Sequence, residues 1–426
     1  MYNSNELKSR IAGGELNETL TMLYGADALE AQKARYSEAI DEFVKIFGAP
    51  QGIGLFSAPG RTEIGGNHTD HNNGKVLAGS VNLDVIAVAA KNDSGIIRIK
   101  SKGFDMDTID ISDLSIKDDE IGRSSSLIRG VAAKMKDEGY EIGGFDAYTT
   151  SSVLKGSGIS SSAAFEILVC TILSEIYNEG KVDPVDQAKY SQYAENVYFG
   201  KPCGLLDQMA ASVGGILSID FKDVQAPVIN KVDFDFTKTG YALCIVDTGG
   251  NHADLTGDYA AIPSEMKGIA QLLGCSVLRE TSEVEVLRNA AFIREKLGDR
   301  ALLRAIHYFE ENKRVDVEVD ALNNDDFQGF LQTVIQSGES SYKYLQNVYA
   351  NVNPAEQGIS LALCLAESIL KGKGAWRVHG GGFAGTTQNF VPLDMLDTFK
   401  TTMEAVFGEG HCHVLFIRPV GGVKVG

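Results

Sequence analysis

The feature that most constrains the fold is a helix-sized apolar run that directly follows a turn rich in glycine and serine. The turn, GSGISSSAA, covers residues 156–164, and the run over 163–177 contains only four polar residues: Glu166, Thr171, Ser174 and Glu175. A helix that is apolar on nearly all sides must be buried. The turn in front of it lies where backbone N–H groups and the positive end of the helix dipole converge, an arrangement suited to phosphate. A plain serine N-cap is the alternative interpretation.

Length and charge restrict the class of protein. A chain of 426 residues is long for a single core, so two domains are expected. The 44% hydrophobic and 23% charged residues are typical of a globular protein. The net charge of −18 argues against nucleic acid or an anionic membrane as a partner, but it leaves room for a local positive patch that binds ATP. The sequence leaves the oligomeric state open, and a monomer is compatible with it.

The N-terminus shows no basic start followed by an apolar core, and no apolar run approaches about 18 residues. We therefore expect neither a signal peptide nor a membrane span. The cysteines are scattered and none has metal-ligand spacing, so we predict buried free thiols in a reducing cytoplasm: Cys170, Cys203, Cys244, Cys275, Cys364 and Cys412.

Helix and strand patterns alternate irregularly, which favours an α+β fold. Helical spacing predicts helices over 28–47, 126–138, 163–177 and 184–199, the last with Asp183 as its N-cap. Strands are predicted over 54–58, 81–90, 96–100, 216–221 and 241–247. The polar stretch 222–239 is the candidate domain boundary.

Two further clusters carry ionisable groups. Residues 58–74, APGRTEIGGNHTDHNNG, have loop-like composition and hold Arg61, His68, Asp70 and His71, which indicates a site for a polar ligand. A metal held by the two histidines is an alternative for this segment. In residues 195–208, ENVYFGKPCGLLDQ, Glu195 and Asp207 flank a Gly/Pro turn, as they would if one held a cation and the other addressed a hydroxyl.

Two nucleotide-binding classes are disfavoured. The chain contains no GxxxxGK[ST] motif, so a P-loop ATPase is not expected. GGGFAG over 380–385 matches GxGxxG, but the residues after it have strand character, whereas a dinucleotide site requires a helix there.

Taken together, the segments 61–74, 156–164 and 380–385 resemble, in order and spacing, the three motifs of the GHMP small-molecule kinases. The first is similar to the galactokinase signature, and CGLLDQ resembles the galactokinase segment that carries the catalytic aspartate. The resemblance covers roughly residues 50–390. It implies a two-domain α+β fold: an N-terminal helical arm (1–50), an N-terminal domain like ribosomal protein S5 domain 2 (51–225) and a ferredoxin-like C-terminal domain (226–426).

The resemblance further implies an ATP-dependent sugar 1-kinase of the galactokinase type, with Mg²⁺ as a second cofactor. In this sequence the ATP phosphates would be bound by Gly156, Ser157, Gly158, Ile159, Ser160, Ser161 and Ser162. Mg²⁺ would be held by Ser162 and Glu195. Asp207 would face the anomeric hydroxyl with Arg61 beside it, and the sugar would be lined by Asn67, His68, Asp70, Gly204 and Tyr259.

The first motif departs from the galactokinase pattern GRxNxIGEHTDY. Here it is GRTEIGGNHTDH, so that Glu63 replaces the usual asparagine, Asn67 the glutamate and His71 the tyrosine. His379 also replaces a threonine common before the last glycine run. Two alternatives to galactose phosphorylation therefore remain: a GHMP kinase for a related sugar, such as an amino sugar or arabinose, and a silent sugar- and ATP-binding regulator. The complete SSSAA segment argues against the regulator, because silent relatives of this kind characteristically lack a Ser-Ala pair in the phosphate loop.

Overall fold

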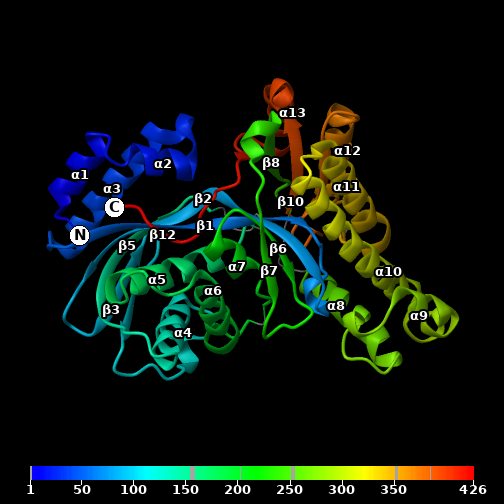
Figure 1. The fold of residues 1–426 in the computed structure, drawn as a ribbon, viewed down its shortest axis with the longest axis horizontal. Coiled ribbons are helices and arrows are strands. Elements are labelled where there is room, and N and C mark those ends of the chain that lie inside the picture. The colour runs from blue at the N-terminus through cyan, green and yellow to red at the C-terminus, as the bar shows by residue number, and fades with distance from the viewer. Residues whose placement is uncertain (1, 154–158, 202, 251–254, 351–353, 384) are drawn as a thin grey trace.

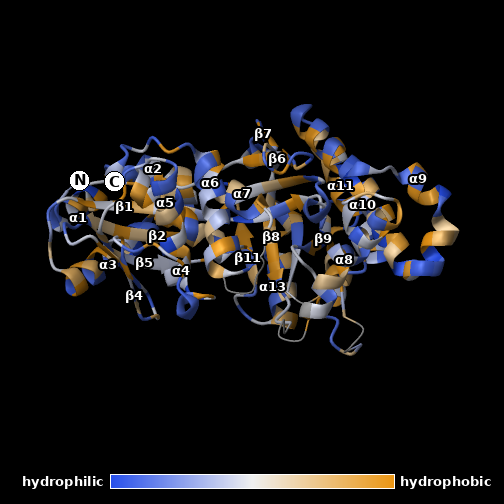
Figure 2. Ribbon diagram, turned by 90° about the horizontal axis from the view of Figure 1, so that it is seen from below, coloured by the Kyte–Doolittle hydropathy of each residue, from blue (hydrophilic) through white to orange (hydrophobic). Residues whose placement is uncertain are grey.

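The computed structural model describes residues 2–153, 159–201, 203–250, 255–350, 354–383 and 385–426 (Figure 1). Gly156, Ser157 and Gly158 of the predicted phosphate turn lie outside these residues. Two sheets organise the described chain, one of eight strands and one of four. In Figure 2 β2 and β8 are coloured largely as hydrophobic, in keeping with the burial of most of their residues.

The large sheet has the strand order β12-β1-β2-β5-β3-β4, with β6 paired to β2 and β7 to β6. Its pairs are antiparallel except β3 with β5. The strands are β1 (Ile53–Gly65), β2 (Lys75–Lys91), β3 (Ile96–Ser101), β4 (Met106–Asp110), β5 (Phe145–Ser151), β6 (Ile216–Asp220), β7 (Val228–Val232) and β12 (Val423–Lys424).

Helices cover both faces of this sheet (Figure 1). One face carries the first three helices, α1 (Ser4–Ala12), α2 (Asn17–Tyr24) and α3 (Leu29–Phe47), whose apolar side chains form one cluster with strand residues such as Leu55 and Val88. The other face carries α4 (Ser124–Asp137), α5 (Ser161–Tyr177), α6 (Pro184–Tyr193) and α7 (Leu206–Val213). The predicted N-terminal segment 1–50 is therefore helical, and its helices pack on one face of the large sheet.

Helix α5 confirms the opening prediction. Its residues from Ala163 to Ser174 are buried except Phe165, and even the carboxylate side chain of Glu166 is 0% exposed. Asp183 caps α6 by accepting a hydrogen bond from the N–H of Val185, as predicted. The predicted helix over 184–199 is α-helical only to Tyr193, where α6 ends. A π-helical turn, Ala194–Phe199, follows it directly.

The small sheet has the order β11-β8-β10-β9, all antiparallel. Numbered along the chain, its strands run 4-1-3-2, the order of a ferredoxin-like β-α-β-β-α-β unit, as predicted. The elements are β8 (Tyr241–Asp247), β9 (Ala375–His379), β10 (Thr386–Pro392), β11 (Cys412–Leu415), α12 (Gly358–Leu370) and α13 (Leu396–Phe407). Before α12 lie α8 (Thr256–Leu272), α9 (Glu283–Arg288), α10 (Ala290–Asn323), α11 (Phe327–Ser340) and a π-helical turn, Ser341–Leu345.

Two predictions about chain organisation need correction. The segment 58–74 is not a loop throughout, because β1 continues to Gly65 in register with β2. The predicted boundary at residue 225 cuts off β7 and β12, although β7 pairs with β6 and β12 pairs with β1 in the large sheet. The sheet therefore extends past residue 225, and the C-terminus returns to it (Figure 1).

All six cysteines are free, as predicted, but only Cys170, Cys244 and Cys412 are buried; Cys203 and Cys275 are half-buried and Cys364 is exposed. Within the described ranges no helix is both long and apolar enough to cross a bilayer.

Candidate active site

Arg61 lies on β1 between two irregularities in the pairing of β1 with β2, one between Pro59 and Arg61 and one between Glu63 and Gly65. Bulges of this kind redirect side chains and are common beside active sites. Gly60 is also required here, since a Cβ on it would lie 2.6 Å from Ile159 Cγ2 and 2.7 Å from the Ile159 carbonyl oxygen. That carbonyl accepts the Arg61 N–H at 3.1 Å, so β1 contacts the end of the predicted phosphate turn directly.

Asp207, in the first turn of α7, is the ion-pair partner of Arg61. The Arg61 Nε donates to Asp207 Oδ1 at 2.6 Å, and the Ser160 hydroxyl donates to Asp207 Oδ2. Burial acts to raise the pKa of Asp207, but the Arg61 charge and these two hydrogen bonds outweigh it, so the pKa is lowered. Asp207 is therefore ionised at neutral pH.

Ser160 precedes α5 in the left-handed region, with φ of 55°. Its hydroxyl is used on Asp207 and makes no capping bond to the helix. The plain N-cap interpretation of the serine turn is thus wrong for this residue. The first turn of α5 keeps the N–H orientation and dipole that favour an anion, and this end of α5 lies beside the Arg61–Asp207 pair.

Glu195 lies in the π-helical turn after α6 and is only 3% exposed. π-Helical turns inside helices are often functional. The Ser162 hydroxyl is 3.4 Å from Glu195 Oε1, and Lys201 Nζ is 3.2 Å from the same oxygen. Gln208, next to Asp207, donates from its Nε2 to Glu195 Oε2 at 2.7 Å and to buried Glu166 at 3.1 Å. The predicted metal ligands are therefore adjacent, and Gln208 links them to the helix of Asp207.

The first and last motifs meet, although more than 300 residues separate them along the chain. Three successive carbonyls of the glycine turn accept hydrogen bonds from predicted sugar-site residues. Gly380 O accepts from Asn67 Nδ2 at 2.8 Å, Gly381 O from His68 Nε2 at 3.1 Å and Gly382 O from the Tyr259 hydroxyl at 2.7 Å. The glycines permit this close approach: a Cβ on Gly381 would lie 2.6 Å from the Tyr259 ring.

Asp70 and Gly204, both expected to line the sugar, also lie together. A Cβ on Gly204 would lie 2.7 Å from Asp70 Oδ2, so the absence of a side chain at 204 leaves space for the carboxylate. His71 is exposed, and its ring lies 5.8 Å from that of His68 between centroids. His68 itself is half-buried and directed to the glycine turn.

Asn67 differs from its predicted role, because its side chain is fully buried and fully used by the protein. Its Nδ2 donates to Glu63 Oε1 at 2.7 Å and to Gly380 O, and its Oδ1 accepts from Asn347 Nδ2 at 2.9 Å and from Ser341 Oγ at 3.3 Å. An amide offers two donors and two acceptor lone pairs, all of which are occupied here. A sugar hydroxyl could bond to Asn67 only by displacing one of these partners.

Several functional contacts have no obvious signal in the sequence. His379 is 2% exposed and joins β1 to β10, since its Nε2 accepts from the Glu63 N–H at 3.3 Å and its Nδ1 donates to Thr386 Oγ1 at 3.0 Å. Lys201 and Gln208 lie inside the segment 195–208, in which only the carboxylates of Glu195 and Asp207 were predicted to be functional. Buried Arg377 donates to Glu63 Oε1 at 3.1 Å and to the Ile64 carbonyl.

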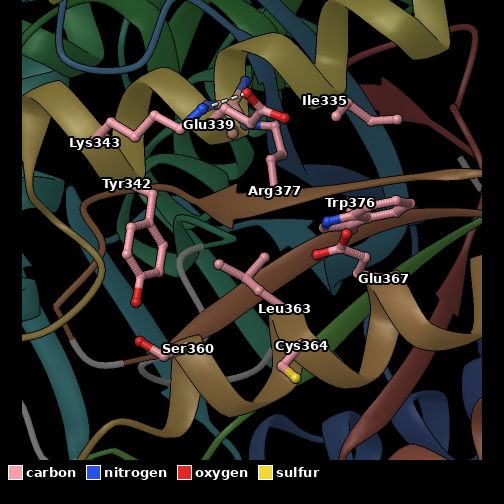
Figure 3. Close-up of a pocket in the computed structure, with 11 residues that line it drawn as sticks. Ile335, Glu339, Tyr342, Lys343, Ser360, Leu363, Cys364, Glu367, Trp376 and Arg377 are labelled. Atoms are coloured by element: carbon pink, nitrogen blue, oxygen red, sulfur yellow. Dashed lines mark hydrogen bonds and ion pairs between the residues drawn. The ribbon is translucent and has the colours of Figure 1, made fainter. Parts of the chain in front are cut away.

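Arg377 also lines a separate hollow of about 370 Å³ between α11, its π-helical turn, α12 and β9 (Figure 3). None of the predicted site residues lines this hollow. Its wall carries Trp376, Tyr342 and the surface ion pair between Lys343 and Glu339.

Gly204→Ala provides a test of the sugar pocket. The added Cβ should displace the Asp70 carboxylate, and loss of a hydrogen bond to a charged group should raise KM for the sugar about tenfold or more. Steady-state kinetics with each substrate varied in turn measure this. Gly268→Ala in α8 is the matched control, because its Cβ would make ordinary contacts of 3.4 Å with Leu297. Equal KM values for the two variants would contradict the assignment of Gly204.

Comparison with known proteins fits this geometry. Residues 41–91 match the galactokinase galactose-binding signature, and residues 126–215 match the GHMP kinases N-terminal domain. Galactokinase of Glaesserella parasuis serovar 5 is 30% identical over 351 residues, which cover 80% of this chain and 86% of that protein. This chain belongs to the galactokinase family. Galactokinase of Streptomyces coelicolor is 29% identical over 375 residues, covering 86% and 92% of the two chains.

Solved structures of the GHMP kinases share the fold. The galactokinase of Lactococcus lactis, complexed with galactose, superimposes with a TM-score of 0.76 at 24% identity over 90% of this chain and 98% of that one. The mevalonate kinase of Methanococcus jannaschii gives a TM-score of 0.62 at 13% identity over 85% and 98%. The two-domain α+β GHMP kinase fold is therefore confirmed, and the chain is a sugar kinase of the galactokinase family.

Proposed function

We propose that this protein transfers the γ-phosphoryl group of ATP to the anomeric hydroxyl of galactose, giving galactose 1-phosphate and ADP. The observation that carries the proposal is the Asp207 carboxylate, which is bonded to Arg61 at 2.6 Å and to Ser160 at the start of α5. A carboxylate, a guanidinium and a helix N-terminus thus converge at one point. These are the groups that an acceptor hydroxyl and a phosphoryl group need.

In this mechanism Asp207 orients the sugar hydroxyl and accepts its proton as the bond to phosphorus forms. Phosphoryl transfer proceeds through a loose transition state, so positioning and charge stabilisation dominate over strong basicity. A carboxylate with a lowered pKa is sufficient for this role, because the hydroxyl becomes acidic only late in the transfer. Arg61 holds Asp207 in place and contributes positive charge beside the transferring group.

ATP is the phosphoryl donor used by this family of kinases. We propose that its phosphates are bound at the N-terminus of α5 by the backbone and hydroxyls of Ser160, Ser161 and Ser162 together with Ile159. Gly156, Ser157 and Gly158, which lie outside the described residues, would complete the turn.

We further propose Mg²⁺ bound by Ser162 and Glu195. The residues fit this ion, because Mg²⁺ prefers hard oxygen ligands and usually takes only one or two from the protein, the rest coming from phosphate and water. Bound Mg²⁺ would neutralise charge on the phosphates. In the described chain no group of three or more His, Cys, Asp or Glu residues could hold a metal ion.

A second candidate is a kinase for a related sugar, such as an amino sugar or arabinose. The hydrogen bonds of Asn67 favour this candidate. The resemblance places residue 67 among the residues that line galactose, but the Asn67 amide is occupied by protein partners instead. His68, Asp70, Gly204 and Tyr259 would then provide the sugar contacts.

The decisive experiment measures ADP release with Mg-ATP on galactose, glucose, galactosamine, N-acetylgalactosamine, arabinose and mevalonate, with Asp207→Asn as a control. Turnover on galactose alone supports the first candidate. Preference for another sugar supports the second. Binding of sugar without turnover on any of them would reject both in favour of a silent regulator.

Sugar affinity should be independent of pH from about 8 down to 5. Burial and the nearby His71 lower the pKa of His68 to about 4, so His68 is neutral across this range, and the lowered pKa of Asp207 keeps its charge constant. Because Gly381 O can only accept, His68 Nε2 carries the proton and Nδ1 is an acceptor. Calorimetric titration of galactose without nucleotide would measure this. A transition near pH 6.5 would mean that His68 titrates as an exposed histidine.

We propose two functional units, the large-sheet unit with its N-terminal helices and the ferredoxin-like unit, with the substrates between them. The free cysteines are in keeping with a cytoplasmic location, which we also propose.

A further inference from the structure

One face of α10 contacts the backbone of the loop over residues 66–75, which carries the predicted sugar residues His68 and Asp70. The contacting side chains lie at positions 307, 308, 311 and 312, a spacing that places them on one side of a helix. His307 Nε2 donates to Asn67 O at 3.0 Å, and the Tyr308 hydroxyl donates to Asn72 O at 2.9 Å. Asn312 Oδ1 accepts from the Lys75 N–H at 2.7 Å. The helix therefore binds the main chain at both ends of the loop.

Glu311 makes the central contact. Its Oε1 accepts from the Gly66 N–H at 3.1 Å and from the Asn67 N–H at 3.3 Å, and it also accepts from the Ser337 hydroxyl at 2.5 Å. Its Oε2 accepts from Arg314 Nε at 2.6 Å. The side chain is 0% exposed. A buried carboxylate is costly unless charged and hydrogen-bonded partners compensate it, and here those partners include two consecutive N–H groups of the loop.

The loop has a conformation that needs such support. His68 and Asn73 both adopt the left-handed region, with φ of 59° and 58°, which non-glycine residues rarely do. A residue in this region stays there only when its surroundings determine it. Gly66, whose N–H Glu311 binds, also has a positive φ, of 86°.

We propose that Glu311 is a positioning residue for the sugar substrate, whose carboxylate fixes the backbone at Gly66 and Asn67 and thereby holds His68 and Asp70 in their binding geometry. This inference rests on the proposed function of the loop in sugar binding. It places a residue of the C-terminal helical region, outside every motif in the sequence, in control of the sugar site.

The test compares Glu311→Gln, which keeps the size but removes the charge, with Glu311→Asp, which keeps the charge but withdraws it from the loop. Both should raise KM for galactose about tenfold while KM for ATP stays unchanged, because the only proposed substrate-binding segment that Glu311 contacts is the sugar loop, its other partners being Ser337 and Arg314. Glu310→Gln is the matched control, since Glu310 is its half-buried neighbour and pairs with Lys313 away from the sugar loop. Hydrogen exchange followed by mass spectrometry should show faster exchange only in peptides that cover residues 60–75.

Parallel increases in the KM of galactose and ATP, or faster exchange throughout the molecule, would overturn the proposal, because they indicate a general structural role. An unchanged KM for galactose in both variants would overturn it as well. If the wild-type protein does not turn over galactose, the proposed function fails, but hydrogen exchange still tests whether Glu311 positions the loop. Unchanged protection over residues 60–75 in both variants would refute positioning by Glu311.

Discussion

Replacing Asp207 by asparagine is expected to lower kcat by about 10²–10⁴-fold, the usual contribution of a positioned general base. The substitution changes the volume little and keeps one oxygen for Arg61, but it removes the proton acceptor and the negative charge. Sugar binding should remain measurable, because the loop residues and the glycine turn are untouched. Single-turnover kinetics with Mg-ATP and a calorimetric sugar titration measure the two effects separately.

The control for this experiment is Asp146→Asn, which disrupts a comparable ion pair outside the site. Arg98 donates to Asp146 from Nε at 2.6 Å and from Nη2 at 2.8 Å, and Asp146 is 8% exposed. This variant should have nearly wild-type kcat even if its stability is slightly lower. Near-wild-type turnover of the Asp207 variant would refute the assignment of Asp207.

Local pattern was sufficient where neighbours in sequence determine the structure. The helix α5, the cap of α6 by Asp183 and the glycine turn between β9 and β10 depend on apolar spacing, one side chain and backbone freedom, all of which are visible in short windows. The proximity of Arg61, Ser160 and Asp207 came from resemblance, since no short window contains more than one of them.

Local pattern failed where distant partners decide. The composition of residues 58–65 suggested a loop, but pairing with β2 keeps this segment extended up to Gly65. The side-chain direction of Asn67 depends on Ser341, Asn347 and Gly380, which follow it by more than 270 residues. The contact of Glu311 with the backbone of Gly66 and Asn67 also joins residues more than 240 positions apart in the sequence. A glutamate on an amphipathic helix gives no sign in the sequence that it is buried.

Replacing Asn67 by glutamate should reduce the free energy of unfolding by about 3–5 kcal/mol, the usual cost of an uncompensated buried charge. The galactokinase resemblance, which places residue 67 among the residues lining the sugar, would instead lead to an expectation of tighter galactose binding. In the structure the new carboxylate would lie beside Glu63 and the Gly380 carbonyl, both of which now accept from the Asn67 amide. Burial already raises the pKa of Glu63, although Arg377 and Arg61 act in the opposite direction. Urea denaturation would measure the loss as a lower midpoint with an unchanged m-value.

The matched variant exchanges the two residues, as Glu63→Asn combined with Asn67→Glu, and restores the order usual in galactokinases. Glu63→Asn alone should also destabilise, because buried Arg377 loses its carboxylate. In the exchanged pair an amide again faces a carboxylate. The double variant should therefore lose less free energy of unfolding than the sum of the two single variants, by a coupling of about 0.5–3 kcal/mol. Strictly additive losses would contradict a direct Glu63–Asn67 interaction. Wild-type stability of the single Asn67 variant together with tighter galactose binding would place residue 67 in the sugar pocket after all.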